Sequence, residues 1–562
     1  MRIMKIMSFV CLAGVIACSA CAETPFCALR FGFAFTNPDR WPEMRVALEK
    51  NRKAFDEVWF STGVSFPKMS WHEEHARECA AAAADLRELG IVPSIELQTV
   101  LGHTDAIIET GDFSGQCWQR MMTSCEGRST KHIPCPRDPN LRAYFTRVAE
   151  LQAAWRPGSV WVDDDLSYRN RAPVSKPSLA LPGCFCDACL AEFRRTENRD
   201  WPRSELAAAI RSDAAVRARW DAFAGEGYAG LTRTIAEAVR RVSPETVLGY
   251  QYGETLHPAI PRGLYEGSGR SVRLRPGAGA YWDTDPHQQL NKAYWLQRML
   301  GDIRREKWVG ACCPEGESCP RTFACRTPQG FILESFENLA LGMDFVSLFA
   351  ADARGDETTA FYADGLFPRL AEAHDFLKGY RDANVGTVPC GLSVKGDHPP
   401  KLVACRGIPI VGAFGKSLGL LPPVASINVR TSGSSGATGG PEYETRVMQI
   451  ASSTGLLDFA ARADAASGAR LPVCLDAATF AFVMPRVKDD LTLVTVAFVN
   501  CSIDRQEPVG VRLRGVPASA TTAVWHLPES DPVRLPLIRG GSFARVTLPR
   551  IGAWECGYLS FE

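Results

Sequence analysis

The segment VWVDDDL, residues 160–166, runs from a short apolar stretch directly into three adjacent carboxylates. A short apolar run bounded by polar residues is typical of a buried β-strand. The flanking residues 140–154 and 204–242 show the apolar spacing of helices. The segment therefore predicts one strand of a parallel sheet covered by helices, with acidic side chains at the carboxyl end of the strand.

This alternation of strand and helix repeats through the first two thirds of the chain. The expected strands are residues 29–35, 57–61, 91–98, 160–166, 247–252, 271–275, 308–313 and 344–349. The expected helices include residues 41–55, 72–89, 140–154, 204–242, 286–305 and 327–341. Eight such units predict an α/β fold, a (β/α)8 TIM barrel with insertions, over residues 23–385. A doubly wound open sheet is the alternative, because periodicity does not reveal whether a sheet closes.

The polar residues near the strand ends favour the barrel, since the chemistry of such barrels lies at the carboxyl ends of their strands. These ends carry carboxylates, amides and aromatic rings, at Glu96 and Gln98, residues 163–165, Gln251 and Glu254, Tyr281, Trp282 and Asp283, and Glu315 and Glu317. Aromatic faces stack on sugar rings, and carboxylates and amides bind hydroxyl groups. The mixture fits a carbohydrate better than a phosphate or a nucleotide.

The composition limits the partners and the number of domains. The chain has 562 residues, 46% of them hydrophobic, which is too many for one ordinary core. Lys and Arg (63) balance Asp and Glu (63), so no basic field attracts nucleic acid. After residue 385 the pattern changes, and it predicts a small α/β domain over 386–470 and an antiparallel β-sandwich over 471–562.

The first residues have the features of an export signal. Arg2 and Lys5 precede an apolar stretch, and the small residues Ala20 and Ala22 then form a cleavage site. We expect residues 1–22 to be removed and the mature protein to be periplasmic or secreted. The alternative is that Cys18 ends a lipobox and becomes a lipidated N-terminus. No later apolar run is long enough to predict a transmembrane segment.

The chain contains 20 cysteines, and three of them lie within one short segment, at Cys184, Cys186 and Cys189. This spacing lets three thiolates approach one ion at about 2.3 Å. Cys135 is the best candidate for a fourth ligand, which completes a tetrahedral zinc site. A cluster of disulfides is the alternative in an exported protein.

Three separated motifs carry a resemblance to a known family. The motif CPRDPNLR spans residues 135–142, the strand that ends in carboxylates spans 161–166, and CFCDACLAEFR spans 184–194. In this order and spacing they resemble the glycoside hydrolase family 42 β-galactosidases, with a weaker similarity over 330–349. The resemblance implies a β-galactoside substrate, a trimer, and a structural Zn2+ held by Cys135, Cys184, Cys186 and Cys189.

The resemblance also implies where the catalytic carboxylates lie. In this clan of enzymes the acid/base ends strand four, the nucleophile ends strand seven, and the anomeric configuration is retained. Asp165 then takes the acid/base position after Asp164, although the family has Asn-Glu there. Three adjacent carboxylates repel one another and raise at least one pKa, as a general acid requires. The shorter aspartate leaves an inverting arrangement or a loss of activity as alternatives.

For the nucleophile, the sequence favours Glu317 over Glu315, because Glu317 precedes a rigid loop that starts at Ser318 and contains Pro320. Glu334 is a third candidate, and we expect it on the surface of a helix. Substrate contacts are predicted from strand positions, and in one case from the family's substrate-binding arginine, at Glu96, Asp164, Arg275, Tyr281, Trp282, Asp283 and Lys131.

The sequence thus predicts an exported glycosidase that cleaves a β-glycosidic bond, acts from the chain end and retains configuration. A barrel that binds carbohydrate without hydrolysis is the alternative. The sequence shows no catalytic metal site and no Ser/His arrangement that indicates another class of hydrolase. His72 and His75 are three residues apart, whereas a metalloprotease helix needs histidines four apart. We expect these two histidines on a solvated helix face.

Overall fold

The structure is a computed structural model of the chain. It describes residues 24–32, 36–63, 65–98, 100–101, 118–164, 166–253, 256–277, 286–316, 327–350, 361–393, 405, 407–411, 415–420, 453–477 and 479–562. Within these ranges, no helix combines the length and the apolar character needed to cross a membrane.

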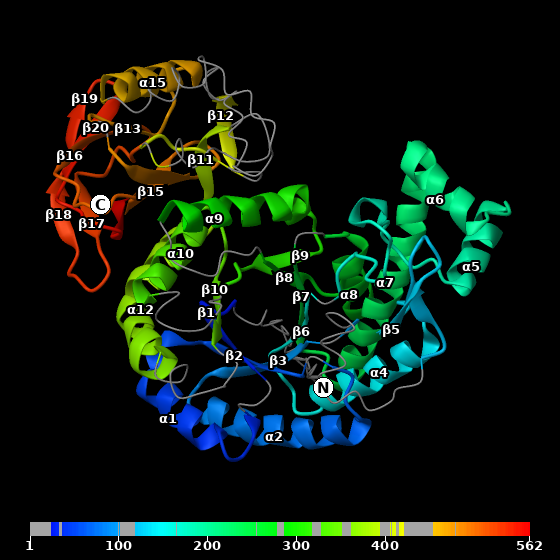
Figure 1. The fold of residues 1–562 in the computed structure, drawn as a ribbon. Coiled ribbons are helices and arrows are strands. Elements are labelled where there is room, and N and C mark those ends of the chain that lie inside the picture. The colour runs from blue at the N-terminus through cyan, green and yellow to red at the C-terminus, as the bar shows by residue number, and fades with distance from the viewer. Residues whose placement is uncertain are drawn as a thin grey trace, which may run out of the picture.

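Eight parallel strands form the central sheet, in the order β10-β1-β2-β3-β6-β7-β8-β9 (Figure 1). Each overlaps one of the strands expected from the sequence, so the predicted parallel sheet is confirmed. Strands that follow one another along the chain lie side by side, as is usual where helices connect parallel strands. Their bounds are β1 Cys27–Phe31, β2 Glu57–Ser61, β3 Val92–Leu97, β6 Ser159–Val162, β7 Val247–Tyr252, β8 Val272–Pro276, β9 Val309–Cys312 and β10 Val346–Ala350.

The chain beyond β9 joins the two edges of this sheet. Gly316 forms a parallel bridge with Leu348 of β10. Its amide donates to the Ser347 carbonyl at 3.0 Å, and its carbonyl accepts from the Phe349 amide at 2.7 Å. A Cβ on residue 316 would lie 2.6 Å from the Ser347 carbonyl oxygen, so the contact requires glycine. The sheet therefore curls until its edges touch, which is consistent with a TIM barrel and not with an open sheet.

Helices surround the sheet, because they return the chain from one strand to the start of the next, and α12 follows the last strand (Figure 1). They are α1 Trp41–Lys50, α2 Met69–Glu88, α4 Pro139–Ala153, α7 Ala214–Val242, α8 Ala259–Ser268, α9 Pro286–Leu300, α10 Pro328–Ala340 and α12 Phe367–Ala383. Shorter elements accompany them: the hairpin β4 Met121–Thr123 and β5 Ser129–Pro134, α5 Asp187–Glu197, α6 Arg203–Ser212, and single turns at Arg52–Ala54, Pro177–Leu179, Gly301–Arg305 and Phe361–Leu366.

The prediction of one helix over 204–242 is wrong, because two helices, α6 and α7, occupy this segment. Asp213 separates them with an extended backbone (φ −117°, ψ 113°), and its carboxylate accepts hydrogen bonds from the Ala215 and Val216 amides. An aspartate in this position satisfies amides that have no partner within the new helix. The apolar spacing continues across the break, so periodicity alone did not reveal it.

The floor of the barrel, at the amino ends of the strands, is a buried polar network around Glu57. Its Oε1 accepts hydrogen bonds from the Ser94 and Ser159 hydroxyls, and its Oε2 lies 3.0 Å from Arg273 Nη1. These residues come from four strands of the sheet. The network therefore pairs a buried carboxylate and ties β2, β3, β6 and β8 together.

Above this floor lies an apolar layer. The rings of Trp59 and Trp161 pack against each other with centroids 4.2 Å apart. Gly249 of β7 faces them: a Cβ there would lie 2.2 Å from the Trp161 ring. Smaller residues complete the layer at Ala28, Cys313 and Phe345. Because alternate residues of a strand point to the same side, the next inward position forms a third layer at the carboxyl ends.

Two further sheets contain the C-terminal strands (Figure 1). The seven-stranded sheet has the order β12-β11-β14-β15-β21-β17-β18, and the four-stranded sheet the order β13-β16-β20-β19. Strands from both sides of residue 470 share the larger sheet, and a separate apolar core lies beneath them. The bounds are β11 Val388–Ser393, β12 Lys416–Leu420, α15 Ser453–Ala466, β13 Val473–Leu475, β14 Ala481–Val487, β15 Leu493–Asn500, β16 Val509–Leu513, β17 Thr522–His526, β18 Val533–Pro536, β19 Ile538–Gly540, β20 Phe543–Leu548 and β21 Cys556–Phe561.

His72 and His75 of α2 are buried, so the expectation of a solvated helix face is wrong. His72 Nε2 lies 2.7 Å from the Tyr144 hydroxyl of α4, and the His75 ring stacks on Trp71 with centroids 4.7 Å apart. Burial lowers the pKa of His72 to about 4. Burial, together with the neighbouring His72, lowers the pKa of His75 to about 3. Both rings are therefore neutral packing residues near neutral pH.

The buried His75 should make the protein sensitive to acid. A histidine with a lowered folded pKa gives its full stability above the unfolded value of about 6.5 and loses it as the pH falls toward the folded pKa. Between pH 7 and pH 5, His75 should lower the free energy of unfolding by roughly 2 kcal/mol. Between the same two pH values, the free energy of unfolding of His75→Gln should therefore fall by roughly 2 kcal/mol less than that of the wild type. Urea denaturation followed by tryptophan fluorescence measures both values.

His132, which is only partly buried, provides the matched control. We expect His132→Gln to keep the pH dependence of the wild type. A wild-type pH dependence in His75→Gln as well contradicts the assignment of a buried neutral ring.

Candidate active site and metal centre

The third layer of the barrel is a ring of charged and polar side chains at the carboxyl ends of the strands, called here the charged ring. All of its members are buried, with at most 8% exposure. Gln251 accepts a hydrogen bond from Arg275 within it. The members are Arg30 (β1), Glu96 (β3), Asp163 (after β6), Gln251 (β7), Arg275 (β8) and Glu315 (after β9).

Two arginines hold the acidic members of the charged ring. Arg30 Nε donates to Glu96 Oε2 at 2.5 Å, and Arg30 Nη2 lies 3.5 Å from Asp163 Oδ1. Arg275 Nη1 donates to Glu315 Oε1 at 2.7 Å, and Arg275 Nη2 lies 3.8 Å from the same Asp163 oxygen. Asp163 thus lies between the two arginines, and the ring is one continuous network of ion pairs.

Glu315 is the carboxylate at the end of the seventh strand of the barrel. Its burial alone raises its pKa, but the charges of Arg275, Lys292 and Arg30 outweigh burial and lower the pKa of Glu315. Within the described residues, its Oε2 has no hydrogen-bond partner. A Cβ on Gly277 would lie 2.9 Å from this oxygen, so glycine leaves it uncovered on that side. One oxygen is therefore fixed by Arg275, and the other suits an ionised nucleophile.

The structure brings three of the predicted site residues, Glu96, Arg275 and Glu315, into the charged ring. Asp164 is partly buried, and its Oδ2 lies 3.5 Å from the position of a Cβ on Gly253. Lys131 is exposed on β5. The other predicted residues lie outside the described residues; they are Asp165, Glu317, Tyr281, Trp282 and Asp283.

The expectation that Glu334 lies on a helix surface is wrong. Glu334 is 2% exposed, and its Oε1 lies 2.9 Å from Nζ of Lys292 on α9. The reason is the position of α10, whose residues from Gly330 to Ala340 are all buried. A helix enclosed on every side has no solvated face, so its carboxylate requires a buried cation.

Sequence analysis missed Arg30 and Lys292 as residues of the site. Arg30 stands in the strand CALRF, where its neighbours are apolar. A charged residue inside an apolar strand is buried only if it is paired. That signal was present in the sequence, whereas the identity of its partner, Glu96, depends on the curl of the sheet.

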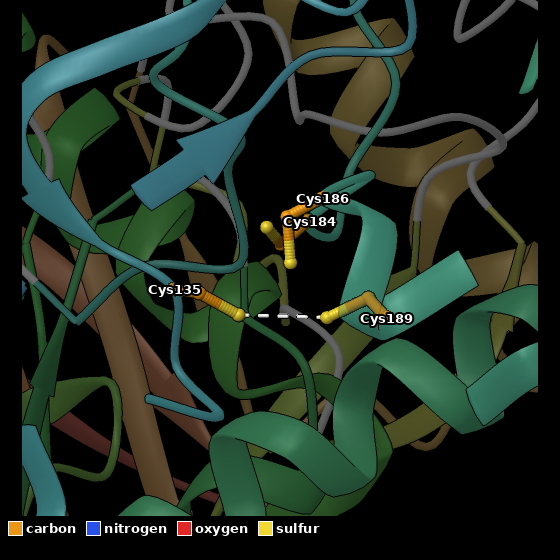
Figure 2. Close-up of side chains that lie close together, drawn as sticks. All are labelled: Cys135, Cys184, Cys186 and Cys189. Carbon is orange, nitrogen blue, oxygen red and sulfur yellow. Dashed lines mark hydrogen bonds between the residues drawn. The ribbon is translucent and has the colours of Figure 1, made fainter. Parts of the chain in front are cut away.

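Four buried thiols form a second cluster (Figure 2). Cys135 precedes α4, and Cys184, Cys186 and Cys189 lie around the start of α5. All four sulfurs lie within 4.8 Å of one another, and the Sγ atoms of Cys135 and Cys189 are 3.4 Å apart. In a tetrahedral site with metal–sulfur bonds of about 2.3 Å the sulfurs are about 3.8 Å apart. The four thiols, which are all free, can therefore hold a metal ion.

Asp138 fixes the first half of this cluster. It caps α4, where its side chain accepts hydrogen bonds from the Asn140 and Leu141 amides. Its other oxygen accepts from the Arg120 amide at 2.5 Å. The sequence Cys-Pro-Arg-Asp-Pro thus ends in a helix cap, with proline at the first turn, and Cys135 lies just before the helix.

Asn170 ties the second half of the cluster to the loop that follows β6. Its Nδ2 donates to the Gly183 carbonyl at 2.5 Å and to the Thr123 carbonyl at 2.7 Å. The same Thr123 carbonyl accepts from the Phe185 amide at 2.9 Å. The loop that leaves the charged ring after Asp163 is therefore anchored beside the cysteine triplet.

Comparison with known proteins finds likeness of structure but not of sequence. No protein-family model matches the chain, and no curated protein sequence matches it. The β-galactosidase from Rahnella sp. R3 has a TM-score of 0.55 at 11% identity, over 96% of this chain and 99% of that one. The β-galactosidase from Bacillus circulans sp. alkalophilus has a TM-score of 0.53 at 10% identity, over 96% and 99%. The chain thus shares its fold with these two glycoside hydrolases over almost its whole length.

Removal of one thiol should remove the metal ion. Because a closed four-ligand site contributes to folding, Cys189→Ser should lose its ion and unfold about 5 °C or more below the wild type. Metal analysis of protein purified without a metal-affinity tag, and differential scanning calorimetry, measure the two effects.

Cys125→Ser is the matched control. Cys125 is buried near the same hairpin, but its Sγ contacts the Leu179 carbonyl at 3.3 Å and lies outside the four-thiol cluster. We expect this variant to keep its metal. A wild type with less than about half an equivalent of metal, and with the four thiols oxidised, contradicts the metal site.

Proposed function

We propose that the chain is an exported glycoside hydrolase related to family 42, which cleaves a terminal β-glycosidic bond. The charged ring is the observation that carries the proposal. Glu315 presents a carboxylate with a lowered pKa at the end of the seventh barrel strand, the position of the nucleophile in retaining enzymes of this architecture. The likeness of fold to two β-galactosidases supports the same class of activity and a β-galactoside substrate.

In the proposed reaction, Asp165 is the acid/base and Glu315 the nucleophile, in place of the Glu317 that the sequence favoured. Glu315 attacks the anomeric carbon while Asp165 gives its proton to the leaving oxygen, so the aglycone departs as an alcohol and a glycosyl ester remains. Water then loses a proton to Asp165 and cleaves the ester. Two inversions give a sugar with retained configuration.

The remaining polar residues have proposed roles in binding the sugar. Arg275 fixes one oxygen of Glu315 with a charge-assisted hydrogen bond and so directs the other toward the anomeric carbon. Contacts to hydroxyl groups and ring faces are assigned to Glu96, Asp164, Lys131, Tyr281, Trp282 and Asp283.

Zn2+ is the proposed ion of the four-thiol cluster, because closed sites of four thiolates are typical of structural zinc. The ion supplies folding stability and takes no part in the reaction. Its proposed effect on catalysis comes through the loop after β6, which carries Asp164 and continues to the cysteine triplet. A trimer remains the oligomer implied by the resemblance.

Export is proposed from residues 1–22 alone. Cleavage after Ala22 gives a mature chain that starts at Glu23, whereas a lipoprotein starts at a lipidated Cys18. Mass spectrometry of the mature N-terminus distinguishes the two.

A barrel that binds carbohydrate without cleaving it is the second candidate. The pair Asp164-Asp165, where the family has Asn-Glu, favours it. A side chain shorter by one methylene withdraws the carboxyl group by roughly 1.5 Å, which places the proton too far from the leaving oxygen unless the backbone has moved.

Kinetics on a panel of aryl β-glycosides test the assignments. Glu315→Ala should lower kcat/KM by roughly 10³-fold or more, because the covalent step loses its nucleophile. Asp165→Ala should lower it by roughly 10²- to 10⁴-fold through loss of proton transfer. Azide should restore turnover of the Glu315 variant and give a glycosyl azide of inverted configuration, identified by NMR.

Glu317→Ala is the control, two residues away from Glu315, and should keep most of the wild-type activity. The opposite pattern, with loss at Glu317 and not at Glu315, makes Glu317 the nucleophile. A wild type that cleaves no glycoside but binds oligosaccharide in calorimetry contradicts the hydrolase and supports the second candidate.

A further inference from the structure

Three consecutive carbonyl groups around Glu315 are each held by a separate donor. The Ser347 hydroxyl donates to the Pro314 carbonyl at 2.6 Å, and the Phe349 amide donates to the carbonyl after Glu315 at 2.7 Å. Both donors belong to β10. The Glu315 carbonyl instead accepts from Nζ of Lys292 on α9, at 2.7 Å. A buried ammonium group, and not the neighbouring strand, therefore fixes the peptide of the proposed nucleophile.

Lys292 is itself held in place. It is 3% exposed, and its Nζ lies 2.9 Å from Oε1 of Glu334 on α10, which is 2% exposed. A buried ammonium is costly unless it is paired, so Glu334 provides the partner that holds Lys292 directed at the Glu315 carbonyl. The pair comes from the helices outside the barrel, whereas Arg275 meets the Glu315 carboxylate from the inside.

We propose that Lys292, held by Glu334, is a positioning residue for Glu315: it fixes the main chain that carries the carboxylate and maintains a positive charge behind it. The proposal rests on the function proposed above and deepens it by assigning a role to an ion pair outside the ring. Lys292 contacts the main-chain carbonyl of Glu315 and the buried carboxylate of Glu334, so we assign its effect on the reaction to the position and charge environment of Glu315.

The charged groups that face Glu315 come from several elements. Arg275 from β8, Arg30 from β1 and Lys292 from α9 are the cations. Of the anions, Asp163 after β6 lies beyond the two arginines, and Glu334 of α10 lies beyond Lys292. Together the cations lower the pKa of Glu315 against the effect of burial. Loss of one cation should therefore raise the pKa of Glu315. Loss of the contact to the Glu315 carbonyl should let the carboxylate move, which should weaken its interaction with the transition state more than the binding of the substrate.

The test removes both members of the pair, because Lys292→Met alone leaves a buried Glu334 without its cation. In the double variant Lys292→Met/Glu334→Leu, the acidic limb of kcat/KM should move to higher pH, because Lys292 is among the cations that lower the pKa of Glu315. The value of kcat should fall by roughly 10-fold, with KM changed by less than about two-fold. Lys292→Arg, which keeps the charge, should leave the acidic limb near its wild-type position.

Gln297→Met is the matched control. Gln297 is buried on the same helix and donates to the Leu341 carbonyl, away from Glu315. Gln297→Met should leave the acidic limb of kcat/KM unchanged. A shift in this variant as well would mean that any disturbance of α9 moves the limb. A double variant that keeps the wild-type circular dichroism and metal content, and also the wild-type acidic limb, overturns the proposal.

A wild type without turnover contradicts the proposed hydrolase but still allows this test. The folded pKa of Glu315 is then obtained from the pH dependence of unfolding, by comparing chains with and without Glu315→Gln. A carboxyl with a lowered folded pKa loses its stabilising effect as the pH falls through that pKa. Removing the pair should move this loss to a higher pH. The same pH in both backgrounds overturns the role of Lys292.

Discussion

The burial of charge inside the barrel is the constraint on which the candidate site depends. An ion that leaves water costs several kcal/mol even after the protein relaxes, unless a partner with good geometry compensates it. The charged ring meets this cost with two arginines and three carboxylates, and Asp163 lies between the arginines. No member can move without leaving another uncompensated. The positions of Glu96 and Glu315, on opposite sides of the network, are therefore fixed relative to each other.

The four-thiol cluster and the charged ring meet at one loop. β6 ends beside Asp163, and the chain then continues to Asn170 and to the cysteine triplet. The charged ring holds the first end of this loop through ion pairs, and the four-thiol cluster and Asn170 hold the other end. A loop that is fixed at both ends loses most of its conformational freedom before any ligand binds. The cysteines thus restrain the segment that carries Asp164, although they lie outside the ring.

Local sequence patterns predicted the strands of the barrel and the cysteine cluster, but not the side-chain partners within the site. The eight strands followed from short apolar runs, and the four cysteines from their spacing and from the resemblance. Side-chain partners were not predictable in this way, because Arg30 and Glu96 meet only after the sheet has curled. Glu334 was misplaced for a related reason: its helix has enough polar residues to suggest a surface, but strands and helices cover it on all sides. The break between α6 and α7 was missed because Asp213, which caps α7, does not interrupt the apolar spacing of the sequence.

The apolar layer below the charged ring supports the positions of the charged side chains above it. Trp161 lies on the inner face of β6, and Asp163 follows two residues later, just past the end of the strand, so the packing of the tryptophan helps to set the position of the aspartate. The Trp161 indole donates to the Ser159 hydroxyl at 2.8 Å, and its ring fills the space left by Gly249. A methyl group at position 249 has no room unless Trp161 moves, and Asp163 then moves with it. Through its contact with Trp161, Gly249 thus supports the position of Asp163, the partner that both arginines share.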